Sequence, residues 1–170
     1  MNIFIRNATV EDALDMGTLH TLSWQVAYKG IIDQNYLDAI DAQKRIEKWR
    51  EIIENKTPTQ TILVAELNGK IIGFASGNVH EEYKGRYFIQ ALYLHPSYFN
   101  KGLGVPLLEG FKKATRKLGY DKMACTVLKE NKRARRVYER EGGVHQKRMA
   151  TGFQTSDGHN YLEEVYFFDI

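Results

Sequence analysis

The chain has 170 residues, of which 43% are hydrophobic. This length fits one domain, 1–170, and the composition excludes a disordered or fibrous protein. With 24 Lys and Arg against 21 Asp and Glu, the formal charge of +3 tolerates a polyanionic ligand but does not demand nucleic acid. The lone Cys125 excludes a disulfide framework, and no Cys/His pair has metal-ligand spacing. The first residues lack a secretory leader pattern and no apolar run is long enough to span a membrane, so we expect a cytoplasmic protein.

Hydrophobic periodicity and turn residues predict eleven elements. In chain order they are strand 1–6, helix 10–28, helix 33–53, strands 59–67, 70–79 and 87–95, helix 102–118, strand 122–128, helix 132–140, and strands 144–153 and 161–170. Thr9 and Asp12 form a capping box before the first helix, and Asn68-Gly69 is the strongest hairpin signal. A turn at 156–159 joins the last two strands.

The element order predicts the arrangement of the strands. Strands 59–67, 70–79 and 87–95 should form an antiparallel meander. Helix 102–118 separates strand 87–95 from strand 122–128, and such a crossover makes its two strands parallel. We therefore expect an α/β (α+β) domain with a mixed, mostly antiparallel central sheet flanked by helices.

Two glycines stand at the start of helix 102–118. Gly102 and Gly104 carry no Cβ, so a ligand can approach the backbone closely there. The first N–H groups of a helix have no internal partner, the helix dipole favours anions, and Lys101 adds a positive side chain. These features indicate a phosphate site. The P-loop lysine and hydroxyl residue are absent after the second glycine, as is the third glycine of a dinucleotide fingerprint.

A second motif follows strand 122–128. Asn131 and Tyr138 are separated by about two helical turns, so both side chains lie on one helix face. Together with the glycine pair, this segment resembles the GNAT N-acetyltransferase superfamily, whose signature combines a Q/R-x-x-G-x-G/A loop with an N-x-x-A-x-x-x-Y helix. Asn131, Ala134 and Tyr138 match the helix motif, and the resemblance covers about residues 87–144.

The resemblance implies that acetyl-CoA binds between strands 87–95 and 122–128, which would splay apart as a parallel pair. The positions that would contact it are Leu92, Tyr93, Leu94, Asn100, Lys101, Gly102, Leu103, Gly104, Val105, Asn131 and Arg133. Tyr138 corresponds to the usual general acid, which protonates the departing thiolate. The implied reaction is direct attack of an amine on the thioester in a ternary complex.

Two positions depart from the family pattern. Phe99 stands where the family places Gln or Arg at the start of the loop, and Asn100 is the available substitute. Phe88 stands where close relatives often have a glutamate that accepts a proton from the amine, which phenylalanine cannot do. The candidates left for the general base are His80, Glu81, Glu82 and water.

The acceptor pocket is expected near Trp24 and Tyr28, which lie four residues apart on the first helix. Plain core packing is the competing interpretation of this aromatic pair. The acidic pairs at 81–82 and 163–164 could attract a cationic amine, or could be solvated surface. The acceptor is expected to be a primary amine of a small, polyamine-like molecule or of a peptide.

The alternative function is a non-catalytic GNAT-like module that senses acyl-CoA or binds an acidic polymer. Phe88 and Phe99, which stand where the family often has polar residues, keep this alternative open. The basic run 132–136 could contact CoA phosphate, nucleic acid or only solvent. We expect no nucleic-acid or membrane partner, no metal, and Cys125 as a core residue. The terminal strand 161–170 offers an edge through which a homodimer could form.

Overall fold

The computed structural model describes residues 3–150, 152–155 and 158–170. Residue 151 of the predicted strand 144–153, and residues 156 and 157 of the predicted turn, lie outside the described residues. The strands are β1 (Phe4–Asn7), β2 (Thr61–Leu67), β3 (Lys70–Val79), β4 (Tyr87–Leu94), β5 (Lys122–Leu128), β6 (Val144–Ala150) and β7 (Glu163–Asp169). The helices are α1 (Ala13–Ala27), α2 (Gln34–Asp38), α3 (Ala42–Glu54), α4 (Gly104–Lys117) and α5 (Lys132–Arg140), with short 3-10 turns η1 (Val10–Asp12), η2 (Glu81–Tyr83) and η3 (Pro96–Tyr98).

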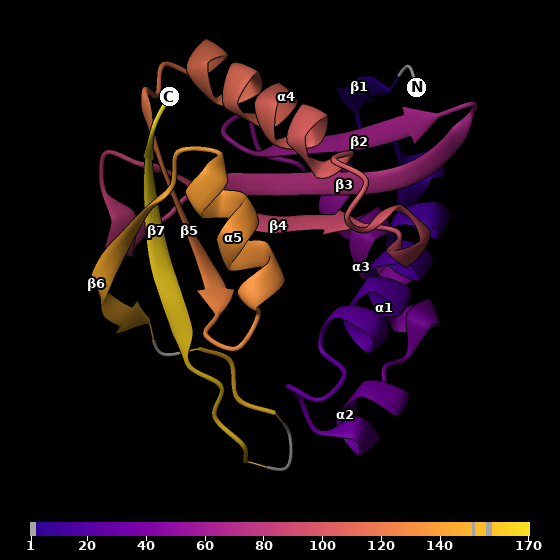
Figure 1. Ribbon diagram of the computed structural model, residues 1–170. Coiled ribbons are helices and arrows are strands. Elements are labelled where there is room, and N and C mark those ends of the chain that lie inside the picture. Colours follow the sequence, from indigo (N-terminus) through magenta and orange to yellow (C-terminus); the bar gives the residue numbers. More distant parts are fainter. Residues whose placement is uncertain (1–2, 151, 156–157) are drawn as a thin grey trace.

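All described strands belong to one mixed sheet in the order β1-β2-β3-β4-β5-β7-β6 (Figure 1). Strands β1 to β4 are antiparallel neighbours, which confirms the predicted meander. Asn68 and Gly69 both have positive φ angles, 52° and 76°, as the tight turn between β2 and β3 requires. The pairing of β4 with β5 is parallel, as the crossover through α4 predicted.

The C-terminal strand is not an edge of the sheet. β7 lies between β5 and β6 and pairs antiparallel with both. The expectation that residues 161–170 form an exposed edge is therefore wrong, because β6 folds back and pairs with the outer side of β7. β6 occupies that edge instead.

Three helix boundaries differ from the prediction. The segment 33–53 forms two helices, α2 and α3, and not one. The Asp41 carboxylate accepts hydrogen bonds from the N–H groups of Gln43 and Lys44, and this N-cap begins α3 as a new helix. The first helix begins as a 3-10 turn, where the Asp12 carboxylate accepts from the Thr9 N–H over 2.8 Å. α4 starts at Gly104, two residues later than expected.

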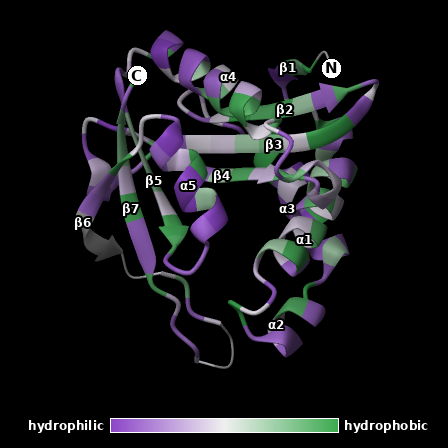
Figure 2. Ribbon diagram, in the orientation of Figure 1, coloured by the Kyte–Doolittle hydropathy of each residue, from purple (hydrophilic) through white to green (hydrophobic). Residues whose placement is uncertain are grey.

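The helices form two layers around the sheet (Figure 1). α4 and α5 cover one face, where the core is built around Leu107, Phe111 and Tyr138. α1 and α3 cover the other face, with Met16, Trp49 and Phe74 in the core. The strands of the sheet are rich in hydrophobic residues, whereas α5 is largely hydrophilic (Figure 2). Within the described residues, no helix is both long and apolar enough to cross a membrane.

α1 and α3 approach each other closely at a glycine. A Cβ on Gly17 would lie 2.5 Å from Ile46 Cγ1 and 2.6 Å from the Ile46 backbone. Such a separation is far inside van der Waals contact, so only glycine allows this helix spacing. The close packing holds α1 against α3 on this face of the sheet.

Candidate active site

The central strands separate at a defined point. β4 and β5 pair at only three positions, Tyr87 with Met123, Phe88 with Ala124, and Ile89 with Cys125. Beyond them both strands continue, but each pairs only with its outer neighbour, β3 or β7. An extra residue in β4 at Gln90 shifts its register against β3 at the same level.

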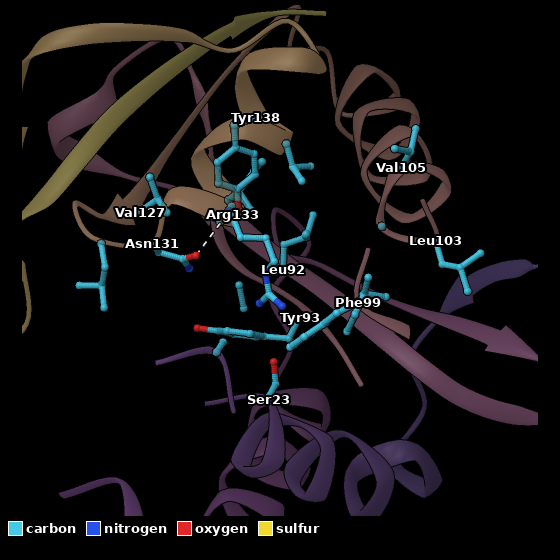
Figure 3. A pocket seen from close by; sticks show the side chains of 18 of the residues that line it. Ser23, Leu92, Tyr93, Phe99, Leu103, Val105, Val127, Asn131, Arg133 and Tyr138 are labelled. Atoms are coloured by element: carbon cyan, nitrogen blue, oxygen red, sulfur yellow. Dashed lines mark hydrogen bonds between the residues drawn. The ribbon is translucent and has the colours of Figure 1, made fainter. Parts of the chain in front are cut away.

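A cavity of about 440 Å³ occupies the opening between the two strands (Figure 3). Its walls come from β4, β5, the loop before α4, one face of α5, and α1. The expected cofactor positions that line it are Leu92, Tyr93, Leu94, Asn100, Gly102, Leu103, Gly104, Val105, Asn131 and Arg133. Tyr138 and Tyr28 line it as well. The fold therefore gathers residues from both sequence motifs around one space.

Lys101 and Trp24 are the two expected site residues that do not line the cavity. The Lys101 ammonium lies 5.6 Å from the centroid of the Tyr98 ring. Trp24 packs edge-on against Tyr28, with ring centroids 4.9 Å apart, and the Arg45 guanidinium covers it at 4.6 Å. Trp24 thus supports the wall that Tyr28 forms.

The loop before α4 has the backbone that its glycines predicted. Asn100 and Gly102 have φ angles of 59° and 74°, so the chain turns sharply before the helix begins. The Val105 N–H already has a hydrogen-bond partner within the loop, since it donates to the Gly102 carbonyl over 3.2 Å. The anion site expected here therefore depends on the backbone groups that precede Val105.

Phe99 has a specific partner in the second motif. The Arg133 guanidinium lies 3.5 Å from the centroid of the Phe99 ring, a cation–π contact. Figure 3 shows the Arg133 side chain reaching from α5 across the cavity toward Phe99. Burial lowers the pKa of Arg133, yet the group keeps its charge. A cation therefore lies beside the position where the family pattern has a polar loop residue.

Asn131 and Tyr138 occupy the α5 wall of the cavity. Asn131 Oδ1 accepts a hydrogen bond from the Ala134 N–H over 3.2 Å, which caps α5 and leaves the side-chain NH₂ able to donate to another group (Figure 3). Tyr138 is 7% exposed, and burial raises the pKa of its phenol well above 10. Its O–H is therefore protonated throughout the neutral range and can donate.

The expected base candidates do not reach the cavity. Phe88 stacks on Tyr83 with ring centroids 5.0 Å apart, and His80 packs against the same pair. Neither His80, Glu81 nor Glu82 is among the lining residues. His80, Tyr83 and Phe88 form an aromatic cluster near the start of β4, away from the cavity.

The carboxylate that does line the cavity is that of Glu163, at the start of β7. Burial raises the pKa of this carboxyl, and the nearby Thr126 hydroxyl acts in the opposite direction. From the sequence, residues 163–164 were expected either to attract a cationic amine or to be solvated surface. No local motif marks Glu163, because its position depends on the pairing of β7 with β5.

Comparison with known proteins agrees with this geometry. A model of the acetyltransferase (GNAT) family matches residues 20–143. The "uncharacterized N-acetyltransferase YuaI" of Bacillus subtilis (strain 168) is 26% identical over 133 residues, which cover 76% of this chain and 73% of that protein.

Two solved structures share the fold. PaiA N-acetyltransferase from Thermoplasma acidophilum, in complex with coenzyme A, aligns with a TM-score of 0.76 at 21% identity, covering 100% of both chains. YncA from Salmonella typhimurium, with its cofactor acetyl-CoA, aligns with a TM-score of 0.72 at 20% identity, covering 99% of this chain and 94% of that chain. The predicted GNAT-type fold is confirmed. Because the family model spans most of the chain, including the glycine loop and α5, this protein belongs to the acetyltransferase (GNAT) family.

Proposed function

We propose that the protein transfers the acetyl group of acetyl-CoA to a primary amine of a small molecule or peptide, by direct attack within a ternary complex. The observation that carries this proposal is the separation of β4 from β5 after Ile89 and Cys125. It leaves strand-edge backbone groups facing a cavity, and buried N–H and C=O groups need partners. The amide-rich pantetheine arm of CoA can supply them by pairing like an added strand.

The remaining walls suit the other parts of the cofactor. The turn through Gly102 exposes backbone at the mouth of α4, where the helix dipole favours a pyrophosphate. The Arg133 guanidinium and the Asn131 amide face the same space and can bind CoA oxygens. The bound molecules named for PaiA and YncA, coenzyme A and acetyl-CoA, support this choice of cofactor.

Tyr138 would act as the general acid. The amine nitrogen attacks the thioester carbonyl carbon, a C–N bond forms, the C–S bond breaks, and the nitrogen loses one proton, so that no net proton is gained or lost once Tyr138 is reprotonated. The Tyr138 O–H then protonates the leaving thiolate, which a phenol can do because burial keeps it in its acid form. Cys125 is an unsuitable acetyl carrier, since it is 1% exposed and burial raises the pKa of its thiol. Direct transfer is therefore the simplest route.

The test is calorimetric titration with acetyl-CoA and dephospho-CoA, followed by thiol-release assays with spermidine and with a short peptide that has a free N-terminus. We expect saturable acetyl-CoA binding, weaker binding without the 3′-phosphate, and CoA release that depends on the amine. Binding without release for either amine would favour the non-catalytic acyl-CoA-sensing alternative. Retention on DNA that falls steeply with salt would favour the polymer-binding alternative.

A further inference from the structure

Glu163 is the one carboxylate among the described residues that line the cavity. Every other lining side chain is apolar, aromatic, cationic or a neutral polar group. The Glu163 side chain is partly buried. A carboxylate withdrawn from water is costly to desolvate, and such a group usually has a partner or a function. Within the described part of the chain, Glu163 forms no ion pair with a lysine, arginine or histidine.

Strand register places Glu163 on the face of the sheet opposite to α5. β5 and β7 pair Thr126 with Val165 and Cys125 with Tyr166. Side chains alternate along a strand, so Glu163 shares its face with Val165, whereas Glu164 shares the other face with Tyr166. The Tyr166 hydroxyl bonds to residues of α5, which identifies that other face as the α5 side.

The two faces meet at the opening between β4 and β5. Tyr138 enters the cavity from α5, while Glu163 enters it from the side covered by α1. A thioester held between the strands would therefore have the phenol on one side and the carboxylate on the other. Direct aminolysis can use this arrangement, because a base must face the attacking nitrogen and an acid must face the leaving sulfur.

The titratable groups around Glu163 are neutral at the pH of the reaction. They come from every neighbouring wall: Tyr28 of α1, Tyr93 of β4, Cys125 of β5 and Tyr138 of α5. Burial raises the pKa of each of these four groups, so none of them is charged near neutral pH. The two cations that line the cavity have other partners, since Arg133 stacks on Phe99 and Arg140 pairs with Glu141. Glu163 is therefore left to receive a cationic ligand.

We propose that Glu163 is the general base of the reaction and that the acceptor is an alkylamine that arrives as its ammonium ion. The inference rests on the proposed acetyl transfer. The ammonium N–H hydrogen-bonds to the Glu163 carboxylate and gives it one proton, which frees the nitrogen lone pair to attack the thioester carbonyl carbon. A C–N bond forms, the C–S bond breaks, and the thiolate takes the Tyr138 proton. The nitrogen loses its second proton to solvent as the amide forms. Glu163 then releases its proton to solvent and Tyr138 regains one from solvent, so the protein is restored and one proton is released overall.

The proposal explains how the chain can manage without the family's glutamate on β4. Phe88 cannot accept a proton and stacks on Tyr83 outside the cavity, whereas the Glu163 carboxylate lines the cavity from β7. Its raised pKa brings the carboxyl closer to neutral, which makes it a better proton acceptor than a solvated glutamate. The carboxylate form is nevertheless the active one, so the rate should rise as pH rises through the pKa of Glu163.

The test compares Glu163→Gln with the matched variant Glu164→Gln. Glu164 is adjacent in sequence but faces α5, where His145 Nε2 lies 2.6 Å from its carboxylate. With spermidine as the amine, we expect Glu163→Gln to lower kcat by about 100-fold or more, a typical contribution of a general base. Acetyl-CoA affinity should stay within about twofold, and Glu164→Gln should keep kcat within about threefold.

The pH profile separates a base from a simple cation-binding group. In Glu163→Gln the rate should follow the fraction of spermidine amine that is unprotonated. The ratio of the wild-type rate to the variant rate should therefore fall by about tenfold per pH unit as pH rises above neutral. A variant that raised only the KM for spermidine, with kcat unchanged, would overturn the base assignment. Turnover by wild type and Glu163→Gln alike would overturn it as well. Absence of turnover by wild-type protein with spermidine and with the peptide would refute the proposed transfer itself.

A stability measurement tests whether misfolding of Glu163→Gln accounts for its lost turnover. Because the folded state raises the pKa of Glu163, its ionised form opposes folding above that pKa. Glutamine removes this opposition, so Glu163→Gln should melt at the same temperature as wild type or higher at neutral pH. Lost turnover together with a lower melting temperature would overturn the proposal, because impaired folding would then account for the loss.

Discussion

Replacing His20 with asparagine should make the folded protein less sensitive to acid. The imidazole is enclosed by aromatic rings between α1 and the sheet, with centroids 4.6 Å from Tyr93 and 5.7 Å from Phe74. Trp49 Nε1 donates to His20 Nδ1 over 3.1 Å. Burial, and to a lesser degree the charge of Arg45, lower the pKa of His20 from 6.5 to about 3. The folded protein therefore holds this ring in its neutral form.

The magnitude follows from proton linkage. As pH falls below 6.5 the unfolded chain binds a proton at His20 but the folded chain does not, so the stability contributed by the neutral ring is complete above that pH and is lost as pH falls toward 3. Between about pH 7.5 and pH 5 the loss is about 2 kcal/mol. Because the folded ring remains neutral at pH 5, the size of this loss depends chiefly on the pKa of His20 in the unfolded chain.

Urea unfolding of wild type and His20→Asn at these two pH values measures the effect. Asparagine keeps an acceptor for Trp49 but cannot titrate. Its packing cost is the same at both pH values and cancels in the comparison. Wild type should lose about 2 kcal/mol more than the variant between about pH 7.5 and pH 5. Equal losses in the two proteins would refute the conclusion that His20 is held neutral by burial.

Three further predictions concern the cofactor site and the helix packing. Tyr138→Phe should slow the chemical step at least about tenfold with little change in acetyl-CoA affinity, and an unchanged single-turnover rate would exclude Tyr138 as the acid. Arg133→Ala should weaken acetyl-CoA binding in calorimetry about fivefold or more, whereas the exposed Lys132→Ala serves as a control with nearly unchanged affinity. Gly17→Ala should lower the free energy of unfolding by about 1–3 kcal/mol, because its Cβ would collide with Ile46, and an unaltered urea midpoint would contradict the close packing.

Much of the fold could be read from local signals. The Asn68-Gly69 turn and the helical stripe of α4 depend on neighbouring residues, and they predicted the β2–β3 hairpin and the parallel β4–β5 pair. The boundary at Asp41 was missed because the apolar period continues across it, and only the capping bonds show that a new helix begins. The place of β7 inside the sheet was also missed, since strand order depends on long-range pairing.

In the candidate site, two segments could be predicted from the residues alone: the glycine turn at Gly102 and the helix face that carries Asn131 and Tyr138. Both depend on short-range spacing and backbone conformation, which local sequence specifies. The contact of Arg133 with Phe99 and the position of Glu163 in the cavity could not be predicted in this way. Each of those contacts joins segments brought together by packing and strand register, and no local pattern specifies them.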